Sequence, residues 1–366
     1  MTTANIGFKG NCQTTAMGIM PHTDIDRALE LSLSLDIPFW PQLPNVSYYE
    51  DMYVQASEHF PGITVDTEEK KLHFDNARFE KELPLYSEKM AAAETFTLSG
   101  EYSAVYHRFL DKDLHAYSAI RGQLIGPVSF GFRVTDENNR PLIYNEEVKT
   151  LVFDFMQRKV NAQCRELKEK NRNAFVWMDE PGLGWVFSGL SGYSDTRARQ
   201  DYQDFLGGIT GIRSLHLCAN VNLPYLLGMG TELLSFDAYQ IQLMPKGYVA
   251  AVARFLAGGG IISWGIVPTD SATLEQETPE RLAGLIGGYW EVIAANSDIQ
   301  LRQIAEQALV APARCCLKNI GKVGASGETA GGSCPAGAPT SEERVVGMAF
   351  DYVKSVSRVL RERFGL

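Results

Sequence analysis

Short runs of apolar and β-branched residues, bounded by Gly, Pro, Asn or Asp, alternate along the chain with longer segments whose apolar residues recur at helical spacing. This alternation is typical of strand and helix units built around a parallel sheet. The apolar runs predict strands at 15–20, 37–40, 119–125, 175–179, 214–218, 233–236, 261–265 and 309–312. The helical spacing predicts helices at 24–35, 145–171, 196–210, 223–229, 248–257, 279–295, 299–307 and 341–364.

Strands that alternate with helices in this number favour an α/β fold of the (β/α)8 TIM barrel type over an open doubly wound sheet. Such a barrel needs about 250 residues. The chain has 366 residues, so a single barrel domain over 1–366 leaves a surplus. Most of it falls at 45–115, where we predict an insertion between the second and third strands. The rest is a Gly-rich loop at 321–340 that carries Cys334.

Composition narrows the possible partners and the location. A net charge of -10 and a pI near 5.2 argue against nucleic acid and against an anionic membrane surface. The N-terminus lacks a basic segment followed by an apolar run, and no apolar stretch reaches the roughly 18 residues of a membrane span. We therefore expect a cytoplasmic protein without membrane or nucleic-acid partners. Its scattered cysteines predict thiols or metal ligands rather than disulfides, with Cys12 and Cys164 as plain thiols.

His216 and Cys218 are the first candidates for chemistry. Side chains alternate along a strand, so these two residues project from the same face of the predicted strand at 214–218. An imidazole and a thiolate together suit zinc. The alternative is a buried histidine bonded to a carbonyl beside a small apolar cysteine.

Two further candidate ligands follow later predicted strands. Asp237 comes after 233–236, and Cys315 comes after 309–312. The carboxyl ends of parallel strands meet at one rim of a barrel, which would bring these ligands to the first pair. Asp237 has an alternative role as a helix cap. Cys315 is favoured over Cys316, because adjacent strand residues face opposite ways.

The same rim should carry residues that hold a substrate. Asp179 and Glu180 close the predicted strand at 175–179 and precede Pro181, and His22 follows the first predicted strand. A carboxylate pair at a barrel mouth can receive a substrate ammonium group. The alternative is a structural turn, because the residue before proline avoids helical geometry and acidic residues often begin helices.

With these residues in view, the chain resembles the C-terminal catalytic domain of cobalamin-independent methionine synthases, in a short "core" form. That family lies within the barrel superfamily of uroporphyrinogen decarboxylase and the methylcorrinoid:thiol methyltransferases. The resemblance extends over most of the chain, and its segments are MGIMPHT (17–23), GPVS (126–129), MDEP (178–181), HLC (216–218), LSFD (234–237) and CCLK (315–318).

The resemblance implies one zinc ion held by four residues at the rim. The implied ligands are His216, Cys218, Asp237 and Cys315, with Asp237 standing where the family has a glutamate. The resemblance also implies residues that bind a thiol such as homocysteine. Asp179 would grip its amino group with Glu180 beside it, and the loop with Gly18, Ile19 and His22 would lie against it, although Gly18-Ile19 replaces the family's Gly-Ser.

The resulting hypothesis is a zinc-dependent methyltransferase that passes a methyl group from a methylcorrinoid, free or on a corrinoid protein, to a small-molecule thiol. Trp40, Tyr48, Tyr49 and Trp264 would cover the mouth. The enzymatic alternatives are a coenzyme M-type methyltransferase, a thiol-adding lyase and a uroporphyrinogen decarboxylase-like enzyme. The non-enzymatic alternative is a scaffold subunit that docks a corrinoid carrier, whose zinc would be closed by four protein ligands.

Overall fold

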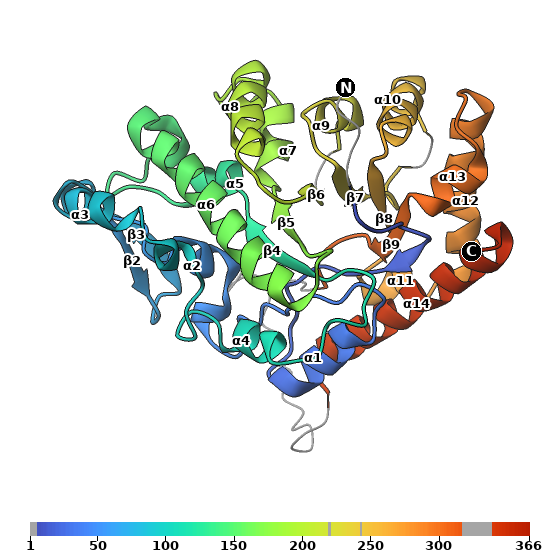
Figure 1. Cartoon of the computed structure of the whole chain (residues 1–366), viewed down its shortest axis with the longest axis horizontal. Coiled ribbons are helices and arrows are strands. Elements are labelled where there is room, and N and C mark those ends of the chain that lie inside the picture. The colour runs from blue at the N-terminus through green and yellow to red at the C-terminus, as the bar shows by residue number, and fades with distance from the viewer. Residues whose placement is uncertain (1–5, 219–220, 242–243, 317–338) are drawn as a thin grey trace.

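A curled parallel sheet forms the centre of the molecule, with helices packed around its outer side (Figure 1). The computed structural model describes residues 6–218, 221–241, 244–316 and 339–366. Within these residues the sheet has seven strands in the order β1-β9-β8-β7-β6-β5-β4. They are β1 (Gln13–Thr14), β4 (Arg121–Ile125), β5 (Phe175–Asp179), β6 (Arg213–Leu217), β7 (Leu233–Asp237), β8 (Ile261–Val267) and β9 (Ala308–Pro312).

The eight predicted helices are all present and are confirmed, and further short helices join them. The α-helices are α1 (Ile25–Leu33), α2 (Met52–Ser57), α3 (Asn76–Lys89), α4 (Ala104–Leu110), α5 (Pro127–Arg133), α6 (Glu146–Lys170), α7 (Gly182–Phe187), α8 (Asp195–Gly207), α9 (Leu223–Leu227), α10 (Lys246–Ala257), α11 (Ser271–Leu274), α12 (Pro279–Ala295), α13 (Leu301–Glu306) and α14 (Ser341–Phe364). The 3-10 helices are η1 (Tyr48–Glu50), η2 (Ala93–Phe96) and η3 (Leu142–Tyr144).

The strands read as nearly continuous apolar runs because both faces of the sheet are covered. Every residue of β8 is buried. Trp264 of β8 packs against Trp290 of α12, so it faces the helices, and its neighbours Ser263 and Gly265 face the concave side. The register aligns Ser263 with Ser235, and Ser235 with His216. The concave side of the sheet therefore carries a band of polar residues.

The prediction of a strand at 37–40 is wrong. The segment has no regular strand structure, although it lies between β1 and β4, where the second strand of a barrel would lie. Ile37 donates its N–H to Thr14 at 2.9 Å, and the carbonyl of Pro38 accepts from Arg121 at 3.0 Å. A single parallel bridge joins Phe39 to Arg121. Pro38 has no N–H to give to a ladder, which keeps the segment irregular between the two outer strands. The first predicted strand, at 15–20, is also wrong as a strand, because the short β1 (Gln13–Thr14) precedes it and only an isolated bridge from Ile19 to Gln42 falls within it.

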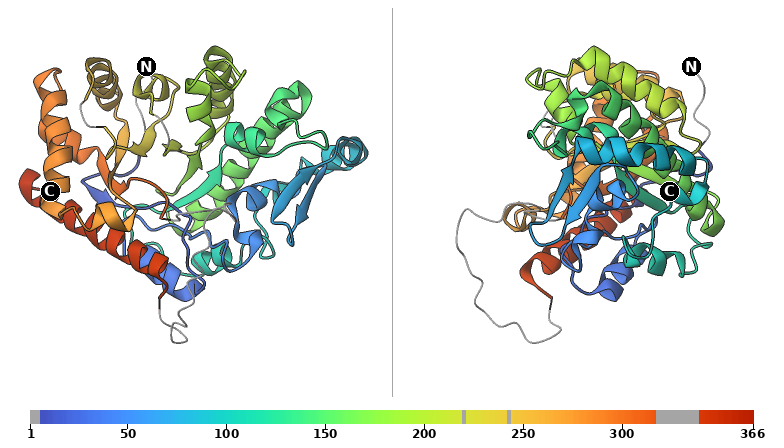
Figure 2. Two further views of the ribbon diagram at one scale, coloured as in Figure 1. Left: turned by 180° about the vertical axis from the view of Figure 1, so that it is seen from behind. Right: turned by 90° about the vertical axis from the view of Figure 1, so that its left-hand side faces the viewer.

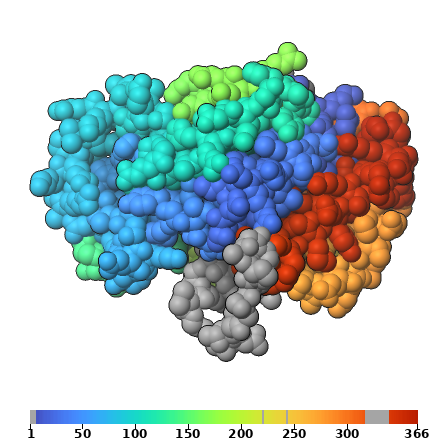
Figure 3. Space-filling model, turned by 90° about the horizontal axis from the view of Figure 1, so that it is seen from below, coloured from blue at the N-terminus to red at the C-terminus, as the bar shows by residue number. Residues whose placement is uncertain are grey.

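Residues 45–115 contain α2 to α4 and a small antiparallel hairpin of β2 (Ile63–Asp66) and β3 (Lys71–Phe74). The hairpin and α3 lie at one end of the molecule, and α12 and α14 lie at the other (Figures 1 and 2). On the face shown in Figure 3, the N-terminal third of the chain packs beside α14. The description of 45–115 as an insertion, and of 1–366 as one domain, stays a prediction.

An apolar plug fills the amino-terminal end of the sheet's interior. Its buried residues come from five strands or strand approaches and from the irregular segment, namely Ile37, Ala119, Phe175, Leu233, Ile261 and Leu309. Phe8 stacks on Phe175 with ring centroids 5.8 Å apart. No helix within the described ranges is long and apolar enough to cross a membrane. The predicted Gly-rich loop and Cys334 fall almost wholly within 317–338, outside the described residues.

Candidate functional site at the carboxyl ends of the strands

His216 of β6 lies on the concave side of the sheet, almost fully buried. Its Nδ1 pairs with the Ser235 hydroxyl at 3.0 Å, and its ring meets Trp177 edge-on with centroids 5.5 Å apart. Burial, together with the positive charge of Arg121, lowers the pKa of His216 to about 3. The imidazole is therefore neutral at physiological pH, with Nδ1 oriented by Ser235.

Arg121 is a member of this site that the sequence analysis missed. The residue begins β4 and is only 1% exposed. Its guanidinium carbon lies 4.7 Å from the ring centre of Phe39 and 4.2 Å from that of Trp177. Burial lowers the pKa of Arg121 to about 9, and Asp179 opposes this effect, so the group stays charged at neutral pH. Arg121 is the one charged residue of the predicted strand at 119–125, and this was the signal that could have found it.

Asp179 ends β5 on the same concave face, opposite His216 in the register. Burial raises the pKa of its carboxyl to about 7, although the Arg121 charge acts in the other direction. Near neutral pH this carboxyl is thus poised between its two protonation states. The register therefore places Asp179 next to His216, at the end of the sheet where the sequence predicted both residues.

Glu180 faces the opposite way and holds α5. Its carboxylate accepts from the backbone N–H groups of Val128 at 3.0 Å and Ser129 at 2.8 Å, and from the Ser129 hydroxyl at 2.6 Å. Gly126, which precedes α5, has no side chain to satisfy these donors, and a Cβ there would lie 2.1 Å from Glu180. Burial raises the pKa of Glu180 to about 7 against these hydrogen bonds. We therefore assign Glu180 a structural role in place of the predicted substrate contact.

Cys218 and Cys315 follow β6 and β9 and are both half-buried. Cys315 lies close enough to Cys218 to affect the pKa of the Cys218 thiol. Burial raises the pKa of Cys218 to about 12, with smaller contributions from Cys315 and Asp179. Cys316 is buried, and burial raises the pKa of its thiol strongly. Cys12 and Cys164 are buried thiols, as predicted.

Asp237 ends β7, and its side chain is 3% exposed. Arg314 donates from Nε to its carboxylate at 2.8 Å, and the Gln240 side chain donates to the same oxygen. This ion pair joins the end of β7 to the residue before Cys315. A metal ion could bind Asp237 only by competing with Arg314.

The donor types at these strand ends fit zinc, which takes neutral imidazole and thiolate sulfur. Their spacing is wider than a bound ion requires. Among the described residues, the group of three whose ligand atoms all lie within 4.8 Å of one another is Asp66, Glu69 and His73, on the β2–β3 hairpin. The predicted ligands at the strand ends form no such group. In the hairpin group, Lys71 already pairs with Glu69 at 2.8 Å.

The loop after β1 reaches the same end of the sheet. His22 is buried, its Nδ1 has no hydrogen-bond partner, and burial lowers its pKa while Glu343 of α14 opposes this. A Cβ on Gly18 would lie 2.4 Å from Cδ of Gln123, so only glycine permits this contact. Ile19 forms a parallel bridge with Gln42. The predicted contact of Gly18, Ile19 and His22 with a substrate stays a prediction.

Two of the four aromatic residues expected to cover the mouth belong to the core. Trp40 and Trp264 are 1% and 0% exposed. Trp40 packs on Tyr106, and Trp264 packs against Phe236 and Trp290. Tyr48 and Tyr49 are half-buried and stay candidates for such a cover.

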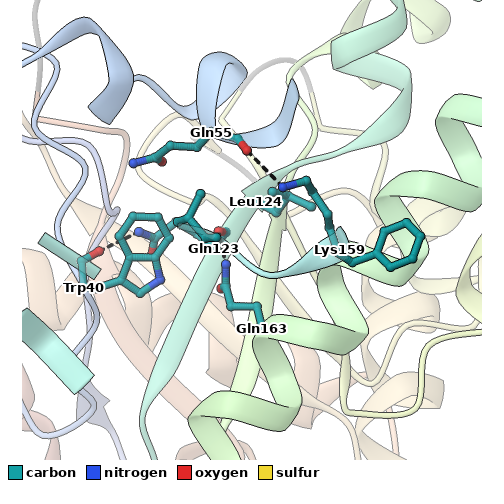
Figure 4. Close-up of a pocket in the computed structure, with 8 residues that line it drawn as sticks. Trp40, Gln55, Gln123, Leu124, Lys159 and Gln163 are labelled. Atoms are coloured by element: carbon teal, nitrogen blue, oxygen red, sulfur yellow. Dashed lines mark hydrogen bonds between the residues drawn. The ribbon is translucent and has the colours of Figure 1, made fainter. Parts of the chain in front are cut away.

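A small internal cavity of about 10 Å³ lies beside β4, between α2 and α6 (Figure 4). Lys159 points toward it and donates to the Gln55 carbonyl at 3.3 Å, while Gln163 donates to the Gln123 carbonyl at 3.3 Å. Burial lowers the pKa of Lys159 to about 8. A cavity of this size holds about one water molecule, so it is no substrate pocket.

Comparison with known proteins leaves the family open. No protein-family model matches the chain, and no curated protein matches it. Among solved structures, the chain is similar to a B12-independent methionine synthase from Shewanella sp. W3-18-1 in complex with selenomethionine, at 12% identity and a TM-score of 0.41. The similarity covers 67% of this chain and 63% of that one, so the chain spans less than two thirds of that protein. Similarity at this level assigns neither a family nor an activity.

Proposed function

We propose that the protein is a zinc-dependent S-methyltransferase of the methionine synthase type. It would pass a methyl group from a methylcorrinoid to a small thiol such as homocysteine. The observation that carries the proposal is the placement of Cys218 and Cys315, two interacting thiols, at the same strand ends as His216, a neutral imidazole. The sequence resemblance described above supports the same reading.

Zinc bound by His216, Cys218 and Cys315 would lower the pKa of the substrate thiol and so provide a thiolate at neutral pH. The protein groups prepare that site. Ser235 fixes the orientation of the imidazole, so Nε2 is the nitrogen left to serve as a ligand. The Cys218 thiol must lose its proton on metal binding, against a pKa of about 12. Metal uptake should therefore release protons.

Asp179 is the group we assign to a substrate amine. Its pKa near 7 means that a neighbouring ammonium group would shift it toward the ionised form. The pairing would hold the amine beside His216, which is opposite Asp179 in the register. Asp237 is not proposed as a ligand while Arg314 occupies its carboxylate.

The test combines metal analysis with a transfer assay. The purified protein should carry about one zinc per chain and should methylate at least one thiol of a small panel with methylcobalamin as donor. Cys218→Ser and Cys315→Ser should lose both zinc and transfer. Cys164→Ser is the matched control, because that buried thiol lies on α6 and donates to the carbonyl of Ala174.

Two results would contradict the proposal. Full zinc content in Cys218→Ser and Cys315→Ser would remove these cysteines as ligands. Zinc-loaded wild-type protein that methylates none of the thiols would reject the methyltransferase assignment even if the metal site were right.

A further inference from the structure

The β2–β3 hairpin, at one end of the molecule, has an apolar face and a polar face (Figure 1). Phe74 is buried, whereas Thr64 and His73 are exposed. His73 lies opposite Thr64 in the register, and Asp66 is two residues further along β2. Because side chains alternate along a strand, these three polar residues share the outer face. Asp66 and His73 are diagonal neighbours across the two strands, a spacing that side chains can bridge.

Three side chains that can bind a metal ion converge at the turn end of this face. They are Asp66, Glu69 and His73, whose ligand atoms all lie within 4.8 Å of one another. Glu69 belongs to the turn, so the group joins both strands and their connection. An ion with ligand bonds of about 2.0–2.2 Å keeps its ligand atoms about 3–4 Å apart. Small rotations of these side chains would therefore close the group around one ion.

Two members of the group can accept an ion without losing a bond. Asp66 Oδ1 accepts from the backbone N–H groups of Glu68 at 2.9 Å and Glu69 at 2.8 Å. These bonds hold the carboxylate over the turn and leave Oδ2 available. The ring of His73 has no hydrogen bond or ion pair within the described part of the chain. An imidazole nitrogen and a carboxylate oxygen are thus free at the same point.

We propose that the hairpin binds a divalent transition-metal ion through Asp66, Glu69 and His73. The imidazole favours Zn²⁺ and its transition-metal neighbours over Mg²⁺ and Ca²⁺, which prefer oxygen ligands. Three protein ligands leave at least one position to water, in contrast to a closed structural zinc site. The site shares no residue with the strand ends, so it does not rest on the proposed function.

Lys71 is the competing cation on this face. It donates to Glu69 at 2.8 Å, and the two side chains are 60% and 59% exposed. An ion pair this exposed contributes little to stability, because water screens it. A divalent ion would therefore replace Lys71 at Glu69 with little loss. The same contact provides a test of opposite sign, since removal of the lysine should favour the metal.

Isothermal titration with Zn²⁺ tests the site in the Cys218→Ser variant of the full chain. That variant lacks a proposed ligand at the strand ends, so the hairpin should account for the zinc that it still binds. Adding His73→Ala should lower the zinc affinity about tenfold or more, because the group loses its nitrogen ligand. His115→Ala is the matched control. His115 is also exposed, but it belongs to no such group of three among the described residues, so the affinity should not change.

Two further measurements address the competitor and the location. Lys71→Ala should raise the zinc affinity about twofold to fivefold, which is the range that loss of a surface ion pair allows. Hydrogen exchange of the wild-type protein locates the ion without any cysteine variant. Zn²⁺ should slow the exchange of backbone N–H groups in β2 and β3, because the ion joins both strands to their turn. EDTA should reverse this effect, and Mg²⁺ should not produce it.

Equal zinc affinity with and without His73→Ala would overturn the proposal. Hairpin exchange rates that Zn²⁺ leaves unchanged would overturn it as well, and an unchanged or lower affinity in Lys71→Ala would remove Glu69 as a ligand. Zinc at the hairpin of a protein that transfers no methyl group would contradict the proposed function alone. Methyl transfer without a zinc effect at the hairpin would contradict the hairpin site alone.

Discussion

At the residue scale, the end of β5 separates two adjacent carboxyl groups. Asp179 faces the concave side with Arg121 and His216, whereas Glu180 turns outward and holds the first turn of α5. The two residues look equivalent in sequence, and strand alternation alone distinguishes them. Burial raises both pKa values to about 7, yet only Asp179 is placed to meet a ligand.

Asp179→Asn should change how stability depends on pH. The pKa of Asp179 is about 7 in the folded protein and 3.8 in its ordinary state, so the folded protein binds this proton more tightly. Its contribution to stability is complete below about pH 4 and is lost as the pH rises toward 7. The free energy of unfolding of the variant, minus that of the wild type, should rise between these pH values and then level off. Urea unfolding at a series of pH values measures it.

The same variant should bind amine-bearing thiols more weakly while it keeps its zinc. Parallel stability curves for variant and wild type would show that Asp179 has no raised pKa. Unchanged affinity for an amino thiol would remove Asp179 from the substrate site. These two readouts can fail independently.

The sequence predicted the site residues that lie at the ends of strands. It missed the residues whose role depends on a contact with a distant part of the chain. His216 and Asp179 followed from their positions at the ends of apolar runs. Arg121 was counted as part of the predicted strand at 119–125, although it is the only charged residue there. The Asp237–Arg314 ion pair joins residues 77 positions apart, and no local pattern announces a contact of that kind.

At the scale of elements, α14 begins with a reciprocal cap that also ties it to the loop after β1. Glu343 accepts from the backbone of Thr340 at 2.8 Å and from the backbone of Thr23 at 3.3 Å, and Thr340 accepts from Glu343 N–H. The cap sets where the helix starts and fixes the loop that carries His22.

Glu343→Ala should lower the free energy of unfolding by about 1–2 kcal/mol, because it leaves two backbone N–H groups without acceptors. Glu342→Ala is the matched control, since that neighbouring glutamate is exposed, and it should change stability by less than about 0.5 kcal/mol. Denaturant unfolding compares the two. Equal effects would mean that the cap contributes nothing beyond helix propensity.

Helices and strands were predicted correctly where the spacing of apolar residues was regular over many residues. They were predicted wrongly where a residue such as proline changes what the backbone can do. All predicted helices exist. Most have several turns of amphipathic spacing or a capping side chain, whereas α13 has six residues and its N-cap, Gln300, makes no side-chain hydrogen bond. The segment at 37–40 is apolar enough for a strand, but Pro38 removes a ladder donor. The hairpin of β2 and β3 went unpredicted, although its sequences ITVD and KLHF alternate apolar and polar residues as a half-buried strand does.

At the scale of the whole molecule, the apolar plug and the polar candidate site occupy opposite ends of the curled sheet. The amino ends of the strands close on an apolar plug that Phe8 completes, and the carboxyl ends carry the polar groups. This division is typical of barrels, in which one end serves stability and the other serves catalysis. The alternation of strands and helices in the sequence predicted the curled sheet, but the polar interior emerged only from the register.

Phe8→Ala should therefore lower stability without changing ligand affinity. Loss of its packing on Phe175 should cost about 1–3 kcal/mol in the free energy of unfolding. Thiol affinity by titration should stay within about twofold of wild type, since sites this far apart couple weakly. Lys9→Ala is the control, because Lys9 is exposed and its ion pair with Glu306 lies at the surface. A large loss of affinity in Phe8→Ala would contradict the separation.

The Asp237 carboxylate is paired with the Arg314 guanidinium, so any metal ion that bound this carboxylate would have to replace a positive charge already there. Binding of a metal ion to Asp237 would therefore break the ion pair and leave the Arg314 guanidinium without its partner, next to Cys315. The strand ends would then present an unpaired guanidinium beside Cys315, and an anion that approached them would meet more positive charge than in the structure described here.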